Sequence, residues 1–346
     1  MSTISATAPA SLGFAPVTLG AFLDGQFGTA QLSLERVGGG QSNPTFFVAH
    51  GPRRMVLRKK PAGHILPGAH AIEREFRMLK ALEQTDVPAP KALLLCEDTN
   101  VVGTPFYLME RLEGRVFHDC ALANASPDER RPLYFAMADV MAKLHSVDPL
   151  SIGLGDYGKP GNYFARQIAR WSRQYDESQS DRIPALERVV ACLREQQPKD
   201  DGHVAIAHGD FRIGNMLFHP SKPEIVAILD WELSTLGHPL ADLGFSCIPW
   251  RTAPGEYGGI LGLDWDAHRL PVEDEFVSRY YNSCDIRTPV LKPFHVAFAL
   301  FRFAVIFVGI ADRARVGNAA GDNASEAGKL AGLLADRAWM ILKDLY

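Results

Sequence analysis

The residues best suited to chemistry in this chain are two aspartates and an asparagine around one predicted hairpin. Two short apolar runs, 215–218 and 225–229, flank a turn rich in proline, serine and lysine, a pattern that predicts two paired strands. Asp210 precedes the hairpin, Asn215 begins it and Asp230 follows it. Because a hairpin brings the start of one strand beside the end of the other, we expect Asn215 and Asp230 to be neighbours, with Asp210 on the entering loop.

Three oxygen-bearing side chains in this arrangement suit phosphoryl transfer. Magnesium takes oxygen ligands and keeps several waters, so Asn215 and Asp230 are predicted to bind Mg²⁺ together with the substrate phosphates. A separate carboxylate must orient the attacking hydroxyl and accept its proton, the role predicted for Asp210. Arg212 is predicted to neutralise charge on the transferring phosphoryl group.

The spacing from Asp210 to Asn215 resembles the Asp-x-x-x-x-Asn of the protein-kinase catalytic loop. His-Gly-Asp at 208–210 replaces His-Arg-Asp, and Asp-Trp-Glu at 230–232 replaces Asp-Phe-Gly. These substitutions are similar to those of the aminoglycoside phosphotransferase and choline-kinase-like family, the small-molecule branch of the kinase fold. The string ILDWELSTLGHPLADL at 228–243 resembles a subgroup that includes the kinase-like domain fused to some acyl-CoA dehydrogenases. The alternative, a hairpin with solvated polar ends, does not explain so many matched positions.

The resemblance implies an α+β, two-lobed, protein-kinase-like fold. Residues 17–110 are expected to form an N-terminal nucleotide-binding lobe with an antiparallel sheet and a helix. Residues 111–114 would be the hinge, and residues 115–346 a larger, mostly helical lobe that carries catalysis and substrate binding. A chain of 346 residues also exceeds what one core usually supports. Residues 1–16, rich in alanine, serine, threonine and proline, are predicted to be a disordered tail.

A glycine loop is predicted between strands at 31–37 and 45–50. In protein kinases a loop in this position covers the ATP phosphates, and glycine lets backbone N–H groups approach them. A Walker loop would instead run into a helix and carry Gly-Lys-Ser/Thr, which is absent here. An ordinary flexible hairpin turn remains the alternative. The residues predicted to bind the phosphates are Gly38, Gly39, Gly40, Gln41 and Ser42.

The resemblance places Arg58 where a protein kinase has the lysine that holds the inner phosphates. It equates Glu75, on a helix predicted over 69–82, with the glutamate that pairs with that cation. Arginine instead of lysine is a departure, because a planar fork replaces a point charge. Lys60 would share a strand face with Arg58 and is an alternative. Solvated charges on an edge strand would explain Lys59 and Lys60 equally well.

Strands are predicted at 91–96 and 105–110, and the second leads into the hinge. In a kinase-like fold the backbone there bonds the adenine edge. The resemblance therefore implies contacts from the backbones of Glu110 and Leu112, with Met109 behind the base. The alternative is an ordinary strand that ends in a charged linker.

Substrate recognition is expected from the helical lobe. Helices are predicted at 127–145, 163–174, 185–196, 239–246, 271–281, 293–316 and 323–345. Asp242 is predicted to brace the catalytic loop, and His145 is more simply a structural residue. The acceptor candidates are Arg166, Arg170, Trp171, Tyr175, Trp250, Arg251, Arg302, Arg313 and Arg315. Each by itself fits a surface or packing role, but the excess of arginine favours an acceptor with a carboxylate or phosphate over one with amines.

The composition narrows the class of protein. With 47% hydrophobic and 22% charged residues, the chain has an ordinary globular composition. A net charge of −4 gives no case for nucleic acid or for an anionic membrane. Five scattered cysteines predict free thiols in a reducing, cytoplasmic compartment, with neither disulfides nor zinc. The apolar segment 303–311 is shorter than the ~18 residues needed to span a bilayer and is predicted to be a buried helix.

We therefore expect an ATP- and Mg²⁺-dependent phosphotransferase that phosphorylates a hydroxyl of a small molecule. The subgroup resemblance favours a hydroxyacyl compound, perhaps as its CoA thioester. The alternatives are an aminoglycoside 3′-type phosphotransferase and a nucleotide-binding pseudokinase or regulatory module. The sequence leaves open the acceptor, the choice of ATP over GTP, and the oligomeric state.

Overall fold

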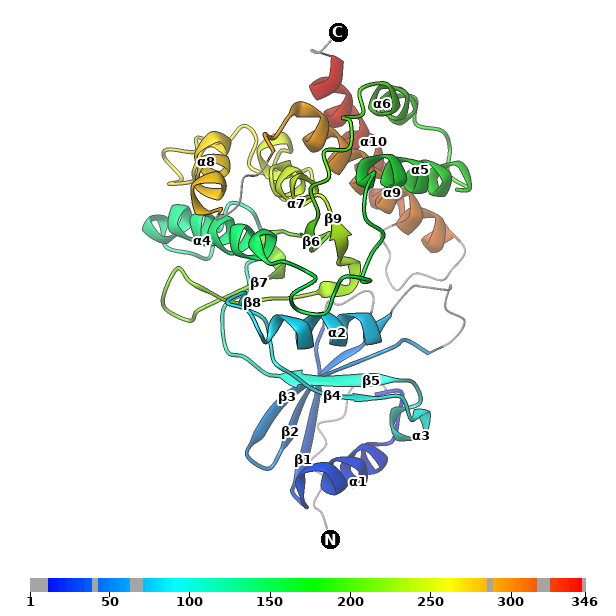
Figure 1. The fold of residues 1–346 in the computed structure, drawn as a ribbon, viewed down its shortest axis with the longest axis vertical. Helices are drawn as coiled ribbons and strands as arrows, with labels where there is room; N and C mark the ends of the chain where they lie inside the picture. The colour runs from blue at the N-terminus through cyan, green and yellow to red at the C-terminus, as the bar shows by residue number, and fades with distance from the viewer. Residues whose placement is uncertain (1–11, 39–42, 63–70, 285–288, 316–323, 344–346) are drawn as a thin grey trace. The chain divides into compact units, whose positions relative to one another are not determined.

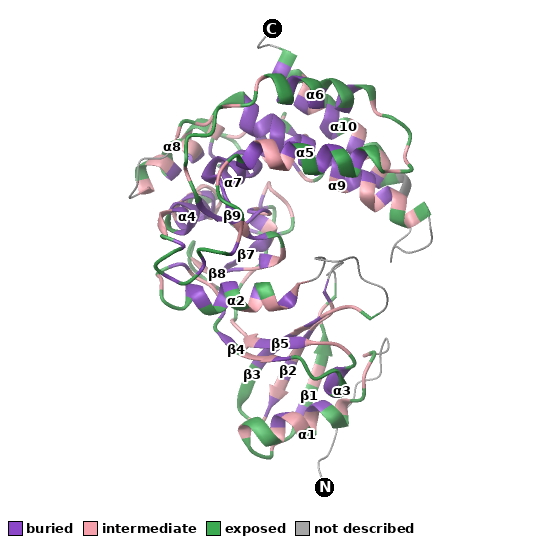
Figure 2. Cartoon of the chain, turned by 45° about the vertical axis from the view of Figure 1, so that its right-hand side comes forward, coloured by how far each residue is buried: buried purple, intermediate pink, exposed green. Residues whose placement is uncertain are grey.

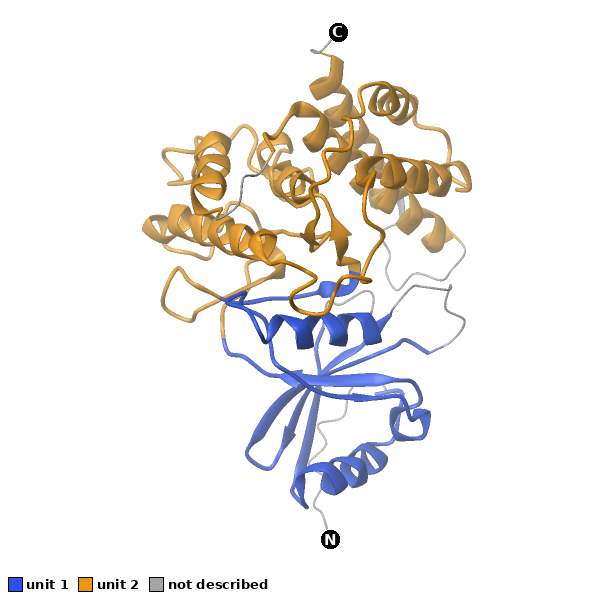
Figure 3. Ribbon diagram, in the orientation of Figure 1, with its two compact units in different colours: residues 1–113, 226–232 blue, residues 114–225, 233–346 orange. Residues whose placement is uncertain are grey.

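The computed structural model describes residues 12–38, 43–62, 71–284, 289–315 and 324–343. The chain divides into two compact units (Figure 3). Unit 1 contains residues 1–113 and 226–232, and unit 2 contains residues 114–225 and 233–346. The segment that follows the predicted hairpin, with Asp230 in it, therefore belongs to unit 1.

Unit 1 is built on a five-stranded antiparallel sheet (Figure 1). Its elements are α1 (Pro16–Phe27), β1 (Leu32–Arg36), β2 (Thr45–His50), β3 (Arg53–Lys59), α2 (Ile72–Leu82), β4 (Ala92–Cys96), α3 (Thr99–Val102) and β5 (Phe106–Glu110). The strand order is β1-β2-β3-β5-β4, so β3 is the central strand and not an edge.

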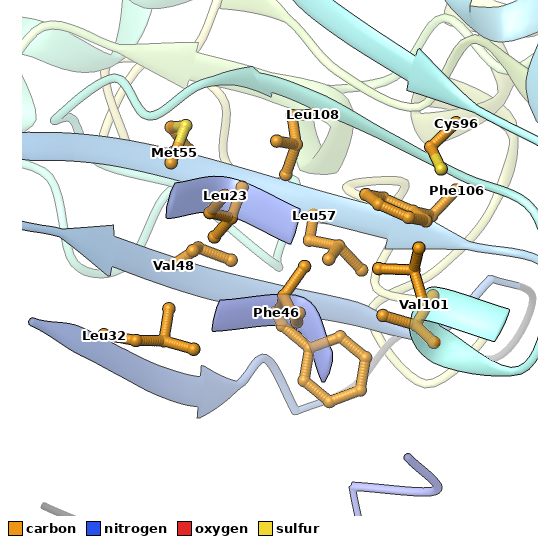
Figure 4. Close-up of a cluster of buried hydrophobic side chains, with 12 residues drawn as sticks. Leu23, Leu32, Phe46, Val48, Met55, Leu57, Cys96, Val101, Phe106 and Leu108 are labelled. Carbon is orange, nitrogen blue, oxygen red and sulfur yellow. The ribbon is translucent and has the colours of Figure 1, made fainter. Parts of the chain in front are cut away.

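One face of this sheet carries a hydrophobic core (Figure 4). Met55 and Leu57 of β3 and Phe106 of β5 lie in it, together with Leu23 of α1 and Val101 of α3. Because side chains alternate along a strand, the residues between them point to the opposite face.

The opposite face of the sheet is the one that α2 covers. Phe76 of α2 lies with its ring centroid 6.1 Å from that of Tyr107, which follows Phe106 on β5. On β3 the same alternation turns Arg58 toward the α2 face and Lys59 toward the core face. The period of two along the strand thus decides which of these two cations can reach Glu75.

The packed part of the chain begins earlier than residue 17, the first residue that was predicted to be ordered. Phe14 packs edge-on against Phe46 with ring centroids 5.4 Å apart, and Leu12 is a partly buried member of the same core. The predicted disordered tail of residues 1–16 is therefore wrong from residue 12 onward, because two apolar side chains anchor this stretch to the sheet. Residues 1–11 lie outside the described part of the chain.

Unit 2 is mostly helical. Its helices are α4 (Pro127–Ser146), α5 (Tyr163–Asp176), α6 (Pro184–Glu195), α7 (Pro239–Ser246), α8 (Glu273–Ser283), α9 (Pro293–Arg315) and α10 (Ala324–Lys343). The fold class is α+β, as predicted. Helix α9 is buried along most of its length (Figure 2), where it packs against α5, α6, α7 and α10. In the described residues α9 is the one helix long and apolar enough to cross a membrane, yet 83% of its apolar stretch is buried in the protein.

Short strands frame the predicted catalytic loop. β6 (Ala205–Ala207) pairs antiparallel with β9 (Thr235–Gly237), a ladder that the sequence did not indicate. β7 (Met216–Phe218) and β8 (Ile225–Ile228) form the predicted hairpin, and the boundary between the units falls within β8. The hairpin turn is closed by the His219 N–H, which donates to the Glu224 carbonyl at 2.7 Å.

Candidate active site

The loop that carries Asp210 is held through its backbone by a buried carboxylate. The N–H groups of His208 and Gly209 donate to Asp242 at 2.6 and 2.8 Å. Gly209 has φ +84°, and a Cβ there would lie 2.7 Å from the carbonyl oxygen of Leu233. This position therefore requires glycine, which explains the one residue by which His-Gly-Asp differs from His-Arg-Asp.

The carbonyl groups of the same loop are also bonded. Arg302 of α9 donates from Nη2 to the Gly209 carbonyl, and Ser246 of α7 donates to the Phe211 carbonyl at 2.7 Å. Buried backbone groups outside regular structure need such partners. Helices α7 and α9 thus fix the backbone on both sides of Asp210.

Asp242 is itself fully buried and paired. His145 Nε2 lies 3.4 Å from its Oδ2, and His145 Nδ1 lies 2.8 Å from the hydroxyl of Tyr280. Burial opposes the charge of Asp242, but its hydrogen bonds with His145 and the Gly209 N–H and the nearby imidazoles hold its pKa below the ordinary value. The predicted bracing role of Asp242 and structural role of His145 both fit this geometry.

We expect Asp242→Asn to lower the free energy of unfolding by about 1–3 kcal/mol, because one loop N–H would then face an amide NH₂. The native pKa is lowered, so the charge stabilises the protein above the unfolded pKa of about 3.9 and stops doing so as pH falls through the folded pKa. Urea unfolding at neutral and acidic pH measures this, with the exposed Asp336→Asn on α10 as control. An equal loss at every pH would contradict the assignment.

Asp210 has one oxygen held and one available. Its Oδ2 accepts from Asn215 Nδ2 at 2.7 Å and from Arg212 Nε at 3.1 Å. Its Oδ1 has no hydrogen-bond partner among the described residues, and the side chain is 20% exposed. Asn215 also donates to the Asp210 carbonyl at 2.8 Å. Because both donations use the amide nitrogen, the amide oxygen of Asn215 remains for another ligand.

Arg58 in unit 1 is surrounded by three carboxylates. Its Nη2 lies 2.6 Å from Asp230 and 3.3 Å from Glu232, and its Nε lies 3.0 Å from Glu75. Burial opposes the charge of Arg58, but the field of the three carboxylates raises its pKa well above the ordinary value. Asp230 has φ +67°, a left-handed conformation that is strained for a non-glycine residue. The predicted pair of Arg58 with Glu75 is present, and Glu232 is a partner that sequence reasoning missed.

Glu75 is held by more than Arg58. Asn43 Nδ2 donates to it at 2.9 Å, and the Tyr107 hydroxyl donates at 3.0 Å. Burial, reinforced by the charges of Asp230 and Glu232, raises the pKa of Glu75 to about 7. Glu75 is therefore fully charged only above neutral pH.

We expect wild-type stability to fall as pH rises from about 4.5 to about 7, relative to Glu75→Gln. The unfolded chain releases the Glu75 proton near pH 4.3, whereas the folded protein retains it to about pH 7, so ionisation in this window favours unfolding. Unfolding free energies at half-unit pH steps measure the slope. Glu73→Gln, in the same turn of α2, is the control and should keep the wild-type slope.

The two lysines that follow Arg58 have partners of their own. Lys59 is 5% exposed, donates to the Val102 carbonyl and lies 5.0 Å from the centroid of the Phe14 ring. Lys60 pairs with Glu73. The reading of Lys59 as a solvated edge charge is therefore wrong, and neither lysine replaces Arg58 beside Glu75.

The predicted nucleotide loop is only partly described. Gly38 follows β1, whereas Gly39, Gly40, Gln41 and Ser42 lie outside the described residues. At the predicted hinge, Met109 pairs with Val56 across β3 and β5.

The backbone of the hinge leaves two groups for a ligand. The Glu110 N–H is already used, since it donates to the Lys91 carbonyl at 2.9 Å. The Leu112 N–H has no backbone partner in the described part of the chain. The adenine contacts predicted for this segment are therefore expected from the Glu110 carbonyl and the Leu112 N–H.

Most acceptor candidates have structural partners instead. Trp171, Tyr175 and Trp250 are buried. Arg251 pairs with Glu273 at 2.8 Å, and buried Arg302 bonds the Gly209 carbonyl. Arg166 bonds carbonyls of its own preceding loop, Arg170 stacks on Trp171, and Arg315 bonds the Gln179 carbonyl. The arginine excess is thus largely structural and says less about the acceptor than the sequence suggested.

Comparison with known proteins gives independent evidence on the family of this chain. The profile of the phosphotransferase enzyme family matches residues 33–273. Acyl-CoA dehydrogenase family member 10 of Mus musculus is 41% identical over 318 residues, which are 91% of this chain and 30% of that protein. Acyl-CoA dehydrogenase family member 11 of Homo sapiens is 39% identical over 297 residues, 84% of this chain and 37% of that protein. The chain thus spans about a third of the length of these relatives.

Solved structures show the same fold along the whole chain. A structure from Ralstonia eutropha JMP134, provisionally named an aminoglycoside phosphotransferase, is 43% identical with a TM-score of 0.85, covering 96% of this chain and 99% of that one. A complex of aminoglycoside phosphotransferase APH(4)-Ia with AMP-PNP and hygromycin B has a TM-score of 0.62 at 15% identity, covering 94% and 98%. The latter shows the fold alone, which is the predicted protein-kinase-like one.

Proposed function

Because this chain belongs to the phosphotransferase enzyme family, we propose that it is a kinase that uses ATP and Mg²⁺ to phosphorylate a hydroxyl group of a small molecule. The observation that carries the proposal is the state of Asp210. Asn215 and Arg212 fix one carboxylate oxygen, and the other has no partner among the described residues. A general base needs this combination of fixed orientation and an available lone pair.

Each candidate site residue has a proposed role. Asp210 orients the acceptor hydroxyl and takes its proton as the oxygen attacks phosphorus, and Arg212 neutralises charge on the phosphoryl group. Arg58 holds the inner phosphates and Glu75 positions Arg58. The resemblance assigns the phosphates to residues 38–42, of which 39–42 lie outside the described part of the chain, and the Glu110 carbonyl and Leu112 N–H would bond the base. The convergence of these groups remains a prediction.

The donor set fits magnesium. The Asn215 amide oxygen and the second carboxylate oxygen of Asp230 are hard oxygen donors of the type that Mg²⁺ selects. A bound ion would supply positive charge that offsets the charge of the phosphates. Asp230 must share its carboxylate between that ion and Arg58, which lies 2.6 Å from its Oδ1.

For the acceptor we propose a hydroxyacyl compound, free or as its CoA thioester. The support is the identity of about 40% with proteins named as acyl-CoA dehydrogenases. This chain matches about a third of the length of those proteins. An aminoglycoside is the second candidate, favoured by the provisional name of the Ralstonia eutropha structure. All five cysteines are free, which supports a reducing, cytoplasmic location.

An acceptor screen tests the proposal. ADP release would be measured with ATP, Mg²⁺ and one candidate of each class: hydroxyacyl-CoAs, free hydroxy acids, amino alcohols, sugars and aminoglycosides. We expect acceptor-dependent ADP release with a hydroxyacyl compound. ADP release with aminoglycosides alone would contradict the proposed hydroxyacyl acceptor but would still support a kinase. Nucleotide binding with no release under any condition would instead favour a binding module.

A further inference from the structure

Unit 2 contains a cavity of about 310 Å³ whose lining includes the first residues of three helices. Its lining includes Tyr163 and Phe164 at the start of α5, Leu240 at the start of α7 and His295 at the start of α9. Helix N-termini carry partial positive charge, although here the Leu240 N–H donates to His238 Nδ1 and the His295 N–H donates to the Lys292 carbonyl. Three of them around one cavity produce a local field that favours an anion.

Two lysines add full charges to that field. Lys199 and Lys292 both line the cavity. Neither forms an ion pair with a described residue. Two carboxylates also line the cavity and partly offset these charges, but their oxygens accept from other groups: Asp200 accepts from the Asn162 N–H at 2.8 Å, and Asp201 lies 3.3 and 3.2 Å from His238 and His203.

His295 supplies the observation that points to a ligand. It is only 3% exposed, and its Nδ1 accepts from the Lys292 N–H at 2.9 Å. The neutral ring therefore carries its proton on Nε2. That atom has no hydrogen-bond partner among the described residues, although the ring lines the cavity. Burial lowers the pKa of His295 to about 4, so at neutral pH Nε2–H is a donor that awaits an acceptor.

A divalent cation is the competing ligand for this region. Ligand atoms of Asp201, His203 and His238 lie within 4.8 Å of one another. However, His238 Nδ1 accepts from the Leu240 N–H at 3.2 Å, so its Nε2 carries the proton and donates to Asp201. Metal ligation at Nε2 would require the proton to move to Nδ1, against that N–H. The local hydrogen bonds therefore favour an anion over a metal.

We infer that this cavity is a binding site for a phosphate or carboxylate group, held by His295 Nε2–H, Lys292 and the helix N-termini. The site is separate from Asp210. In the β6–β9 ladder, Ala207 pairs with Thr235 and Ala205 pairs with Gly237, so His208 and His238 follow opposite ends. The two histidines are four residue steps apart along the ladder, roughly 13 Å at 3.3 Å per residue. The inference does not depend on the proposed function.

Histidine NMR can test this site directly. Protein labelled at the histidine Cε1 carbons is titrated with inorganic phosphate, and separately with acetate, at pH 7.5 and constant ionic strength. His295→Asn identifies the His295 signal and removes the Nε2 donor, while its side-chain oxygen can still accept from Lys292 N–H. Lys292→Met removes one exposed charge with little risk to folding. Lys143→Met, an exposed lysine on α4, is the matched control.

We expect a saturable shift of the His295 signal with phosphate, acetate or both, which distinguishes the two sources of the anion. The dissociation constant read from the His295 signal should rise about 10-fold or more in Lys292→Met and stay unchanged in Lys143→Met. In His295→Asn, where that signal is absent, the neighbouring His238 ring, 6.2 Å from His295 in the wild type, is the reporter and should show the same loss of affinity. A non-saturating shift, or equal affinity in all variants, overturns the inference. A zinc titration that shifts His203 and His238 stoichiometrically, without any phosphate effect, overturns it in favour of a cation.

Discussion

Replacement of Asp210 with asparagine should lower kcat by about 10²- to 10⁴-fold, the usual contribution of a general base, while ATP still binds. The amide can keep the contacts with Asn215 and Arg212, but it cannot take the proton of the acceptor hydroxyl. Turnover is measured with the acceptor found in the screen, and nucleotide affinity is measured by calorimetry on the same preparation.

The matched control is Asp266→Asn, which removes an exposed carboxylate elsewhere in unit 2 and should leave both kcat and ATP affinity unchanged. Unaltered turnover in Asp210→Asn would refute the assignment of the base. Loss of ATP binding together with turnover would instead indicate that the loop had moved, a possibility that the unfolding free energy of the variant checks.

Replacement of Arg58 with methionine should lower the free energy of unfolding by about 3–5 kcal/mol, the usual cost of removing one member of a buried charge cluster. Methionine leaves Glu75, Asp230 and Glu232 without the guanidinium that lies within 3.3 Å of each. Measurement at pH 8 keeps Glu75 mostly ionised in the wild type, in which its pKa is about 7. Nucleotide affinity should also fall, because the proposed phosphate contact is lost.

A double-mutant cycle separates this network from simple loss of a side chain. Adding Glu75→Gln to Arg58→Met removes one of the stranded charges and should recover part of the lost stability. Arg58→Lys keeps the charge but loses the fork that contacts several carboxylates, so it should lie between wild type and Arg58→Met. Arg54→Met, an exposed position on the same strand, is the control. A loss in Arg58→Met no larger than in Arg54→Met would contradict the network.

Local patterns predicted much of unit 1 and the hairpin that follows Asp210. The strands predicted at 31–37, 45–50, 91–96 and 105–110 correspond to β1, β2, β4 and β5, and the turn between apolar runs predicted the hairpin of β7 and β8. The fixed spacing of Asp210 and Asn215 singled out the two residues, and in the structure the Asn215 amide nitrogen donates to Asp210 at 2.7 Å, a contact that was not predicted. These features depend on neighbours close in sequence, where the period of a strand or the length of a loop determines geometry.

The tertiary structure decided which charges are buried and what they contact. Arg302 is 93 residues from Gly209, so nothing local identifies it as a support of the catalytic loop. The three-residue strands β6 and β9 are too short to show a period. Likewise, nothing local in the sequence indicates that Glu232 lies beside Arg58 or that His295 lines the cavity of unit 2.

The sequence by itself therefore determined the fold class, the order of the elements and the residue types available for phosphoryl transfer. The tertiary structure decided which arginine lies beside Glu75, which arginines bond the backbone or pack, and where an anion could bind in unit 2. The physical reason is that period and spacing act over a few residues, whereas burial and ion pairing depend on segments that meet only after folding.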